Sequence, residues 1–320
     1  EPFVMIASDG MPYAPGAHPR SAGTFSRFLG RYVRDQELMN LMRLEPLEVN
    51  LFRGVSRDIG TERVFGGQVL AQALLAASQT VEDRLAHSLH AYFLRAGDPD
   101  AAIVYNVDRS RDGRSFAARR VVAIQHGRPI FTLAASFQAE EEGLEHQFEI
   151  PEVQPPEEVP PPAELSPEEF DHLPRSLQRW LDRFGPIEFR PVRGGNPHDN
   201  ARQPPFKELW FKLHGELGDD PRMHRAMLAY ISDFHLVGTA MLPHGISWSQ
   251  NDLMVASLDH AMWFHRDFRL DGWLLYSCDS PSTSGGRGLA RGMIHDREGR
   301  LLASTAQEGV IRVRRHDSSG

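Results

Sequence analysis

The sequence predicts an α+β protein in which each half consists of a long central helix wrapped by a curved antiparallel sheet. An apolar, helix-like segment begins near residue 64 and is followed by about four strand-like segments. The same order of patterns returns from residue 222 onward, and a proline-rich segment separates the two halves. A helix that is apolar all round must be enclosed, because burial is worth roughly 25 cal/mol for each Å² of apolar surface.

The first predicted helix lies at 64–81, where apolar residues recur at helical spacing and both faces carry small or apolar side chains. Such a helix is expected to be buried nearly all round. Strands are expected at 88–95, 101–110, 115–125 and 129–138, with glycine-containing turns between the last three.

The second half repeats this order, with a helix predicted at 222–241 and strands predicted at 255–266, 272–280, 287–296 and 300–314. Short stretches of the two halves echo each other, such as SLHAYFLR and SLDHAMWFHR. They do not align without gaps, so we expect a diverged internal repeat.

The distribution of proline divides the chain into its predicted parts. Of the 23 prolines, 13 fall between residues 151 and 205, a density that excludes continuous helix or sheet. We therefore expect residues 1–36 to form an N-terminal extension and 37–140 the first domain. Residues 141–205 would form a proline-rich connector, and 206–316 the second domain, which would carry the catalytic residues.

Charge and cysteine content narrow the classes of function. The net charge of −8 argues against a nucleic-acid binder that works by neutralising phosphates. The single cysteine excludes a disulfide within the chain and a cysteine-rich zinc site, and it favours a reducing, cytoplasmic location. No apolar run approaches the roughly 20 residues of a membrane-spanning helix, so no membrane span is expected.

Several longer motifs follow one another in order along the chain. They are LEPLEVNLFRG (44–54), RVFGGQVLAQAL (63–74), RDGRSFAARRV (111–121), YISD (230–233), PHG (243–245), LDHAMWFHR (258–266), WLLYS (273–277) and ASTAQEG (303–309). Together, over about residues 37–315, they resemble the acyl-CoA thioesterase II family. The resemblance implies two fused hotdog domains and, in lipid metabolism, hydrolysis of an acyl-CoA substrate to a free fatty acid and CoA. It implies no metal and no redox cofactor.

The resemblance also implies three residues that hold the attacking water: an Asp on the second helix, a Ser or Thr on the next strand and a Gln on the last. Carried over by motif, these are Asp233 in YISD, Ser257 in ASLDH and Gln307 in STAQEG. Asp233 would be the general base, and Ser257 and Gln307 would orient the water. The oxyanion would be held by backbone N–H groups or by the Gln307 amide, and both options stay open.

The residue pattern alone also permits structural roles. On a regular strand Ser257 and His260 point to opposite faces, which excludes a local Ser-Asp-His triad and leaves His260 as a structural side chain. Asp259 is expected to bond nearby backbone or an arginine. Gln307 lies on an otherwise apolar face and needs a partner, either backbone or a water. Asp233 is unusual within an apolar helix, because aspartate is a poor helix former.

Two groups of arginines are candidates for binding the CoA phosphates. Arg109, Arg111 and Arg114 surround a turn of the first half, and Arg287 and Arg291 occupy the equivalent place in the second half. Guanidinium groups suit phosphate recognition, whereas the alternative is a solvated turn at a strand edge.

Two other functions fit parts of the pattern. An enoyl-CoA hydratase of hotdog type would pair an Asp with a His, but His235 beside Asp233 points away around a helix. A non-catalytic acyl-CoA-binding sensor would show no turnover, which the complete Asp/Ser/Gln set disfavours. The first half offers only Ala77 or Ser78 at the depth of Asp233, so we expect it to be catalytically degenerate. We also expect a homo-oligomer.

Overall fold

The computed structural model describes residues 37–57, 63–160, 186–194, 201–246, 248 and 252–313. Its first half contains helix α2 (Gly66–Ser78) and strands β1 (Glu45–Glu48), β2 (Leu51–Gly54), β3 (Leu85–Phe93), β4 (Ile103–Asp112), β5 (Phe116–Gln125) and β6 (Arg128–Gln138). The first predicted helix and the four strands predicted after it are therefore confirmed. The N-terminal extension predicted at 1–36 lies outside the described residues.

The second half contains helices α5 (Pro221–Ser232) and α6 (Leu236–Thr239) and the short 3-10 helix η1 (Leu242–His244). Its strands are β7 (Ile187–Arg193), β8 (Phe206–Leu213), β9 (Leu253–Ser257), β10 (Asp259–Phe264), β11 (Leu274–Ser284), β12 (Arg287–His295) and β13 (Leu301–Val313). Strands predicted at 272–280, 287–296 and 300–314 are confirmed.

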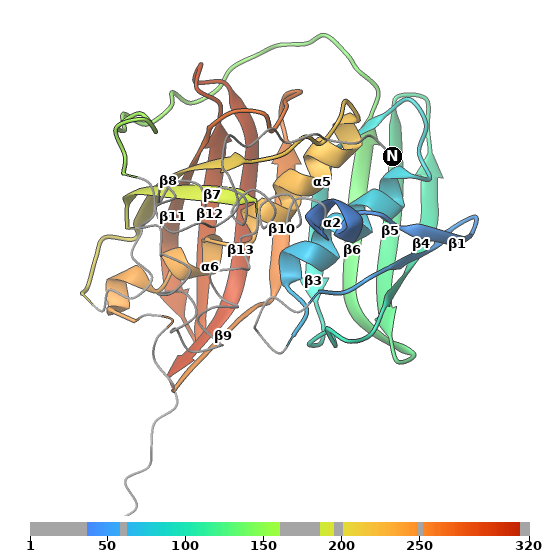
Figure 1. Cartoon of the computed structure of the whole chain (residues 1–320), viewed down its shortest axis with the longest axis horizontal. Helices are drawn as coiled ribbons and strands as arrows, with labels where there is room; N and C mark the ends of the chain where they lie inside the picture. Colours follow the sequence, from blue (N-terminus) through green and yellow to red (C-terminus); the bar gives the residue numbers. More distant parts are fainter. Residues whose placement is uncertain are drawn as a thin grey trace, which may run out of the picture.

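One antiparallel sheet of 13 strands runs through both halves in the order β1-β2-β4-β5-β6-β3-β10-β13-β12-β11-β8-β7, with β9 paired to β13. The halves join where β3 pairs with β10. Figure 1 shows the sheet curving around α2 and α5, which pack against each other on its inner side. Every residue of α2 except Gly66 is buried, as expected for a helix enclosed by the sheet.

Helices α2 and α5 run antiparallel, so each N-terminus meets the C-terminus of the other helix. At one end, Arg222 at the start of α5 donates to the carbonyl of Val81, just beyond α2 (3.3 Å). At the other end, a Cβ on Gly67 would come within 2.5 Å of the Tyr230 carbonyl oxygen. At each end of the helix pair, the N-terminus of one helix therefore lies against the C-terminus of the other, but the residues at the two ends differ.

The single helix predicted at 222–241 is wrong. Helix α5 ends at Ser232, Asp233 is its C-cap, and α6 begins only at Leu236. Aspartate is a poor helix former, and a carboxylate at a helix C-terminus faces the negative end of the helix dipole. Tertiary hydrogen bonds hold the Asp233 side chain instead, and the chain turns there.

The continuous strand predicted at 255–266 is interrupted at Leu258. Ser257 pairs with Gly309 and Ala261 with Ala306, so four steps along this strand oppose three on β13. The extra residue makes a β-bulge, with the Leu258 amide bonded to the Glu308 carbonyl (2.8 Å). The bulge shifts the alternation of side chains between β9 and β10.

The predicted connector, residues 141–205, contains strand β7, which pairs with β8 at the edge of the sheet. Pro191 lies within this strand, and an edge position tolerates a residue that cannot donate a ladder hydrogen bond. Before β7, Val159 packs against Trp210 and Leu275, and the Trp210 indole donates to the Gln154 carbonyl (2.8 Å). The described part of the connector therefore packs on the second half rather than hanging between the halves.

Candidate active site

One side-chain amide joins the three residues expected to hold the water. The Gln307 amide nitrogen donates to the Asp233 carboxylate (Oδ1, 2.5 Å) and to the Ser257 hydroxyl oxygen (3.1 Å). The three residues come from the C-cap of α5, the last position of β9 and the middle of β13. Residues separated by up to 74 positions in the chain are thus brought into direct contact.

The N-terminus of α2 forms another wall of the same site. A Cβ on Gly66 would lie 2.7 Å from an oxygen of Asp233 and 2.9 Å from the ring of Phe93. Only glycine leaves room for this approach of helix and carboxylate. The backbone N–H of Gly67, which has no carbonyl partner within the helix, hydrogen-bonds Asp233.

Burial raises the pKa of Asp233 to about 6. Its side chain is only 4% exposed, and hydrogen bonds from Gln307, Gly67 and Ser257 offset part of the cost of burying the charge. Aromatic rings enclose this region: Phe65 stacks on Phe234 with ring centres 4.4 Å apart. A carboxyl group with this pKa is a carboxylate at neutral pH and a stronger base than an exposed aspartate.

His260 belongs to this site, although strand alternation predicted a purely structural role for it. The bulge at Leu258 brings Ser257 and His260 to the same inner face of the sheet. His260 is 0% exposed, and its Nδ1 lies 3.9 Å from Asp233 Oδ1. Burial lowers the pKa of His260 to about 3, so its ring is neutral. Strand alternation excluded this proximity, and no signal in the sequence placed the bulge.

Two polar atoms of the site have no hydrogen-bond partner among the described residues. They are Gln307 Oε1 and His260 Nδ1, and both are buried. Buried polar atoms in folded proteins are nearly always paired, so these two atoms distinguish the site from an ordinary core.

Asp259, by contrast, has the structural role expected of it. Its carboxylate accepts a hydrogen bond from the backbone N–H of Glu308 (2.7 Å) and thereby holds the bulge against β13. It faces away from the trio of Asp233, Ser257 and Gln307, because His260 beside it points inward.

The structure places Arg109, Arg111 and Arg114 far from Asp233. Arg111 and Arg114 line a cavity of about 520 Å³ at the β4–β5 hairpin. The Gly113 carbonyl in this hairpin accepts a hydrogen bond from Arg84, just beyond the C-terminal end of α2 (2.8 Å). Asp233 contacts the N-terminal end of that helix, and 13 residues of α-helix span about 20 Å.

Arg287 and Arg291 lie on β12, which pairs with β13 beside Gln307. Their side chains are on the outer face of the sheet. Ala290 pairs with Gln307 and shares its inner face, so Arg291 points the other way. Arg287 forms an ion pair with Glu308 (2.9 Å) and Arg291 with Asp279 (2.9 Å). The two predicted arginine groups therefore do not converge on one site.

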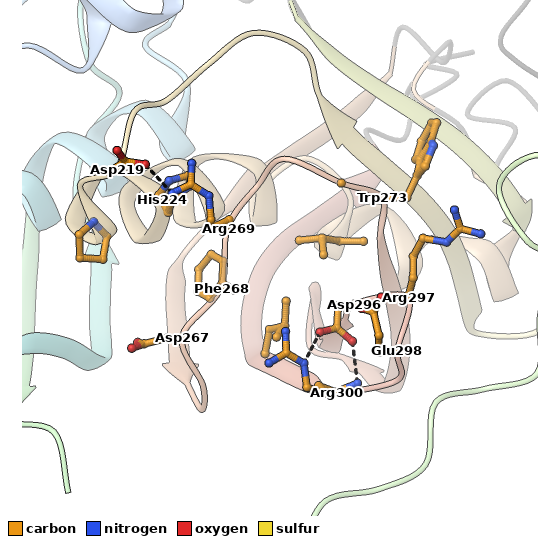
Figure 2. Close-up of a pocket in the computed structure, with 14 residues that line it drawn as sticks. Asp219, His224, Asp267, Phe268, Arg269, Trp273, Asp296, Arg297, Glu298 and Arg300 are labelled. Carbon is orange, nitrogen blue, oxygen red and sulfur yellow. Dashed lines mark hydrogen bonds and ion pairs between the residues drawn. The ribbon is translucent and has the colours of Figure 1, made fainter.

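A cavity of about 570 Å³ lies at the N-terminal end of α5 (Figure 2). Asp233 caps the C-terminal end of that helix. Charged residues line the cavity, and several are already paired: Asp296 binds Arg300 (2.6 Å) and Asp219 binds Arg269 (2.8 Å). The length of α5 separates this cavity from the trio.

Burial raises the pKa of the Cys278 thiol to about 12, so the single cysteine is neutral at physiological pH. Across the residues that the structure describes, no group of three or more His, Cys, Asp or Glu side chains could hold a metal ion. None of the helices in that part of the chain is long and apolar enough to cross a membrane.

Two family profiles match the chain, one in each half. The profile described as "Acyl-CoA thioesterase N-terminal domain" matches residues 55–138, and the one described as "Acyl-CoA thioesterase" matches residues 186–310. Acyl-coenzyme A thioesterase 8 from Homo sapiens is 43% identical over 291 residues, which cover 88% of this chain and 91% of the human protein.

Solved structures give the same result. Acyl-CoA thioesterase II TesB2 from Mycobacterium marinum matches with a TM-score of 0.72 and 39% identity, covering 86% of this chain and 98% of that one. A hot dog fold protein from Alicyclobacillus acidocaldarius, 20% identical, matches with a TM-score of 0.70 over 87% of this chain and 99% of its own. The second likeness shows the fold alone. The chain has a hotdog fold and belongs to the acyl-CoA thioesterase family.

Proposed function

We propose that this protein hydrolyses acyl-CoA thioesters with a water molecule activated by Asp233 and oriented by Ser257 and Gln307. The observation that carries the proposal is the Gln307 amide, which hydrogen-bonds both other residues beside the N-terminus of α2. The raised pKa of Asp233 supports a role as general base. The unpaired Gln307 Oε1 is available to accept the second hydrogen of the water.

The reaction needs one proton acceptor and no covalent intermediate. Asp233 takes a proton from water while the water oxygen bonds the thioester carbonyl carbon, and the carbonyl electron pair moves onto oxygen. When the carbonyl re-forms, the C–S bond breaks and the electrons leave with the CoA thiolate. The thiolate takes the proton from Asp233, so the products are a fatty acid and CoA, and the carboxylate is regenerated.

The N-terminus of α2 is the best candidate for holding the oxyanion. Its first amides have no carbonyl partners within the helix, and the positive end of the helix dipole favours a negative oxygen. The Gly67 N–H already hydrogen-bonds a carboxylate oxygen of Asp233. We therefore favour the backbone N–H groups at this helix terminus over the Gln307 amide, because Asp233 and Ser257 engage both hydrogens of that amide.

The decisive experiment measures free thiol released from palmitoyl-CoA by the wild type and by Asp233→Asn. Loss of a general base should lower kcat by about 10²–10⁴-fold. Asp296→Asn is the matched control, since Asp296 is a second buried aspartate outside the trio, and it should keep the wild-type kcat. Turnover by Asp233→Asn within about threefold of wild type would remove Asp233 from the mechanism.

An enoyl-CoA hydratase remains the alternative to test, because the structure brings His260 close to Asp233. If the protein is a thioesterase, it should release thiol from acyl-CoA and should not reduce the absorbance of an enoyl-CoA. An acyl-CoA-binding sensor would bind both compounds and change neither.

The two matching profiles support the proposal that the chain is two fused hotdog units, with the second carrying the catalytic residues. A role for Arg109, Arg111, Arg114, Arg287 and Arg291 in binding CoA stays a prediction, as do assembly into a homo-oligomer and a cytoplasmic location. A KM for long-chain acyl-CoA that rises with salt and loses this dependence in Arg287→Ala/Arg291→Ala would support the second arginine group.

A further inference from the structure

The hydrogen-bond network around His260 favours the tautomer that carries the hydrogen on Nε2. His260 Nε2 lies 3.0 Å from the Ser232 hydroxyl oxygen, and that hydroxyl donates its single hydrogen to the Ala229 carbonyl (2.9 Å). In that arrangement Ser232 accepts a hydrogen bond from the imidazole. In the neutral ring the hydrogen is on Nε2, and Nδ1 carries a lone pair.

This lone pair faces the proposed base. Nδ1 is buried, has no partner among the described residues and lies 3.9 Å from Asp233 Oδ1. That distance exceeds a hydrogen bond, as expected when a lone pair faces an ionised carboxylate. The two acceptors can bond to each other only when a proton lies between them.

Such a proton arrives during catalysis. When Asp233 removes a proton from water, its carboxyl group becomes a donor, and the unpaired Nδ1 lies 3.9 Å away. We propose that His260 is a positioning residue, whose bare Nδ1 accepts a hydrogen bond from the protonated Asp233 carboxyl until the proton passes to the thiolate. This inference rests on the proposed function, because it requires Asp233 to be the base.

Two titratable groups of β11 near this site do not compete for this proton. Tyr276 and Cys278 on β11 are buried, and burial raises the pKa of both above their usual range, so both are neutral. The Tyr276 hydroxyl is engaged with the Ser232 carbonyl (3.1 Å) and the Thr305 hydroxyl (2.9 Å). Within the described residues, no titratable side chain of α2, β9 or β13 contacts Asp233.

The first test removes the acceptor. His260→Phe keeps a planar ring of similar size but has no nitrogen, and kcat for palmitoyl-CoA should fall about 10- to 100-fold with little change in KM. His295→Phe is the matched control. His295 is also 0% exposed, lies in the same half on the outer face of the sheet, and should keep the wild-type kcat.

The second test changes the tautomer and leaves His260 in place. In Ser232→Ala the Nε2 hydrogen loses its acceptor, so the hydrogen moves to Nδ1 and bonds the Asp233 carboxylate. This bond stabilises the ionised base, and the acid limb of the kcat/KM profile should move about one pH unit below its wild-type position near pH 6. A His260 that only packs in the core would leave this limb unchanged.

The outcomes separate the two proposals. If His260→Phe keeps kcat within about threefold of wild type, or if Ser232→Ala leaves the acid limb in place, the role of His260 is overturned. If His260→Phe does not fold, the Ser232→Ala profile decides alone. If Asp233→Asn retains full turnover, the proposed function itself fails. An inactive Asp233→Asn beside a fully active His260→Phe refutes only the role of His260.

Discussion

Each end of the α2–α5 helix pair buries a charged side chain, Arg119 at one end and Asp233 at the other, and the two are accommodated differently. At the C-terminal end of α2, Arg119 is 2% exposed and uses all five of its N–H donors. Its partners are the Thr80 side chain and carbonyl, the Arg111 and Ala118 carbonyls and the Asp112 carboxylate. Arg119 is therefore fully satisfied and holds the β4–β5 hairpin against the helix, although Arg84 Nε and Arg225 Nη1 at this end have no partner among the described residues.

The end at Asp233 leaves its groups incompletely satisfied. Gln307 Oε1 and His260 Nδ1 have no partner in the described part of the chain, and the pKa of Asp233 is raised to about 6. Each of these features costs stability, because buried polar atoms without partners and buried charges are unfavourable. The difference fits the proposal that the Asp233 end gives up stability for reactivity, whereas Arg119 serves stability.

The largest change in the free energy of unfolding is expected when the hydrogen bonds of Arg119 are removed. Arg119→Met keeps much of the buried volume but leaves several buried oxygens without a donor, at about 1–3 kcal/mol each. We expect the free energy of unfolding to fall by about 3–5 kcal/mol in chemical denaturation, with kcat of the folded enzyme unchanged. A fall in kcat of the folded enzyme alongside the loss of stability would show that Arg119 also serves the reaction.

A smaller effect of opposite sign is expected at the other end. The pKa of Asp233 is about 6 in the folded protein against 3.8 ordinarily, so the folded state binds this proton more tightly. The free energy of unfolding therefore falls as pH rises from about 4 to 6, and the cost is complete above pH 6. Asp233→Asn removes the ionisation and should stabilise the protein by about 2–3 kcal/mol at pH 8.

This gain should disappear on acidification. Thermal unfolding of wild type and Asp233→Asn between pH 4 and pH 8 measures it, and the two curves should converge toward pH 4, where both side chains are uncharged in the folded state. Equal stability of the two proteins at pH 8 would mean that the Asp233 charge is not costly to bury.

The smallest effect concerns the N-termini of the two helices. Helix α5 has an ordinary cap, in which the Asp220 carboxylate accepts from the Arg222 N–H (3.0 Å), whereas α2 begins with Phe65 and two glycines and has no side-chain cap. Asp220→Ala should lower the free energy of unfolding by about 1 kcal/mol and leave kcat unchanged. A fall in kcat beyond twofold would show that this end also serves the reaction.

Much of the fold was predictable, because strongly periodic segments determine their own structure. The all-round apolar pattern of 64–81 became a fully enclosed helix, and the strands after it lie within a few residues of the predicted positions. The helix predicted at 222–241 failed at Asp233, where hydrogen bonds to Gln307 and Gly67 outweigh continuation of the helix. The edge strand β7 was not predicted, because the high density of prolines in this part of the chain was taken to exclude a strand.

The three side chains of the proposed trio could be predicted from the sequence, but the residues that surround them could not. Motif resemblance brought Asp233, Ser257 and Gln307 together, and the geometry supports that grouping. The sequence pattern missed His260, because a one-residue bulge reverses strand alternation and leaves no compositional trace. It also missed the glycines of α2, since contact between two halves of the chain is not encoded in either half alone.

Strands β3 and β10 pair two halves that belong to a single polypeptide. The covalent continuity of the halves has a consequence for how the protein could evolve. In an assembly of identical subunits, any mutation would appear at both ends of the helix pair at once. Covalent linkage removes that symmetry, so an arginine clamp can accumulate at one end without displacing the reactive groups at the other. The cost of this arrangement is stoichiometry: with the proposed reaction centre at Asp233 alone, each polypeptide would carry one centre where a symmetric pair would carry two.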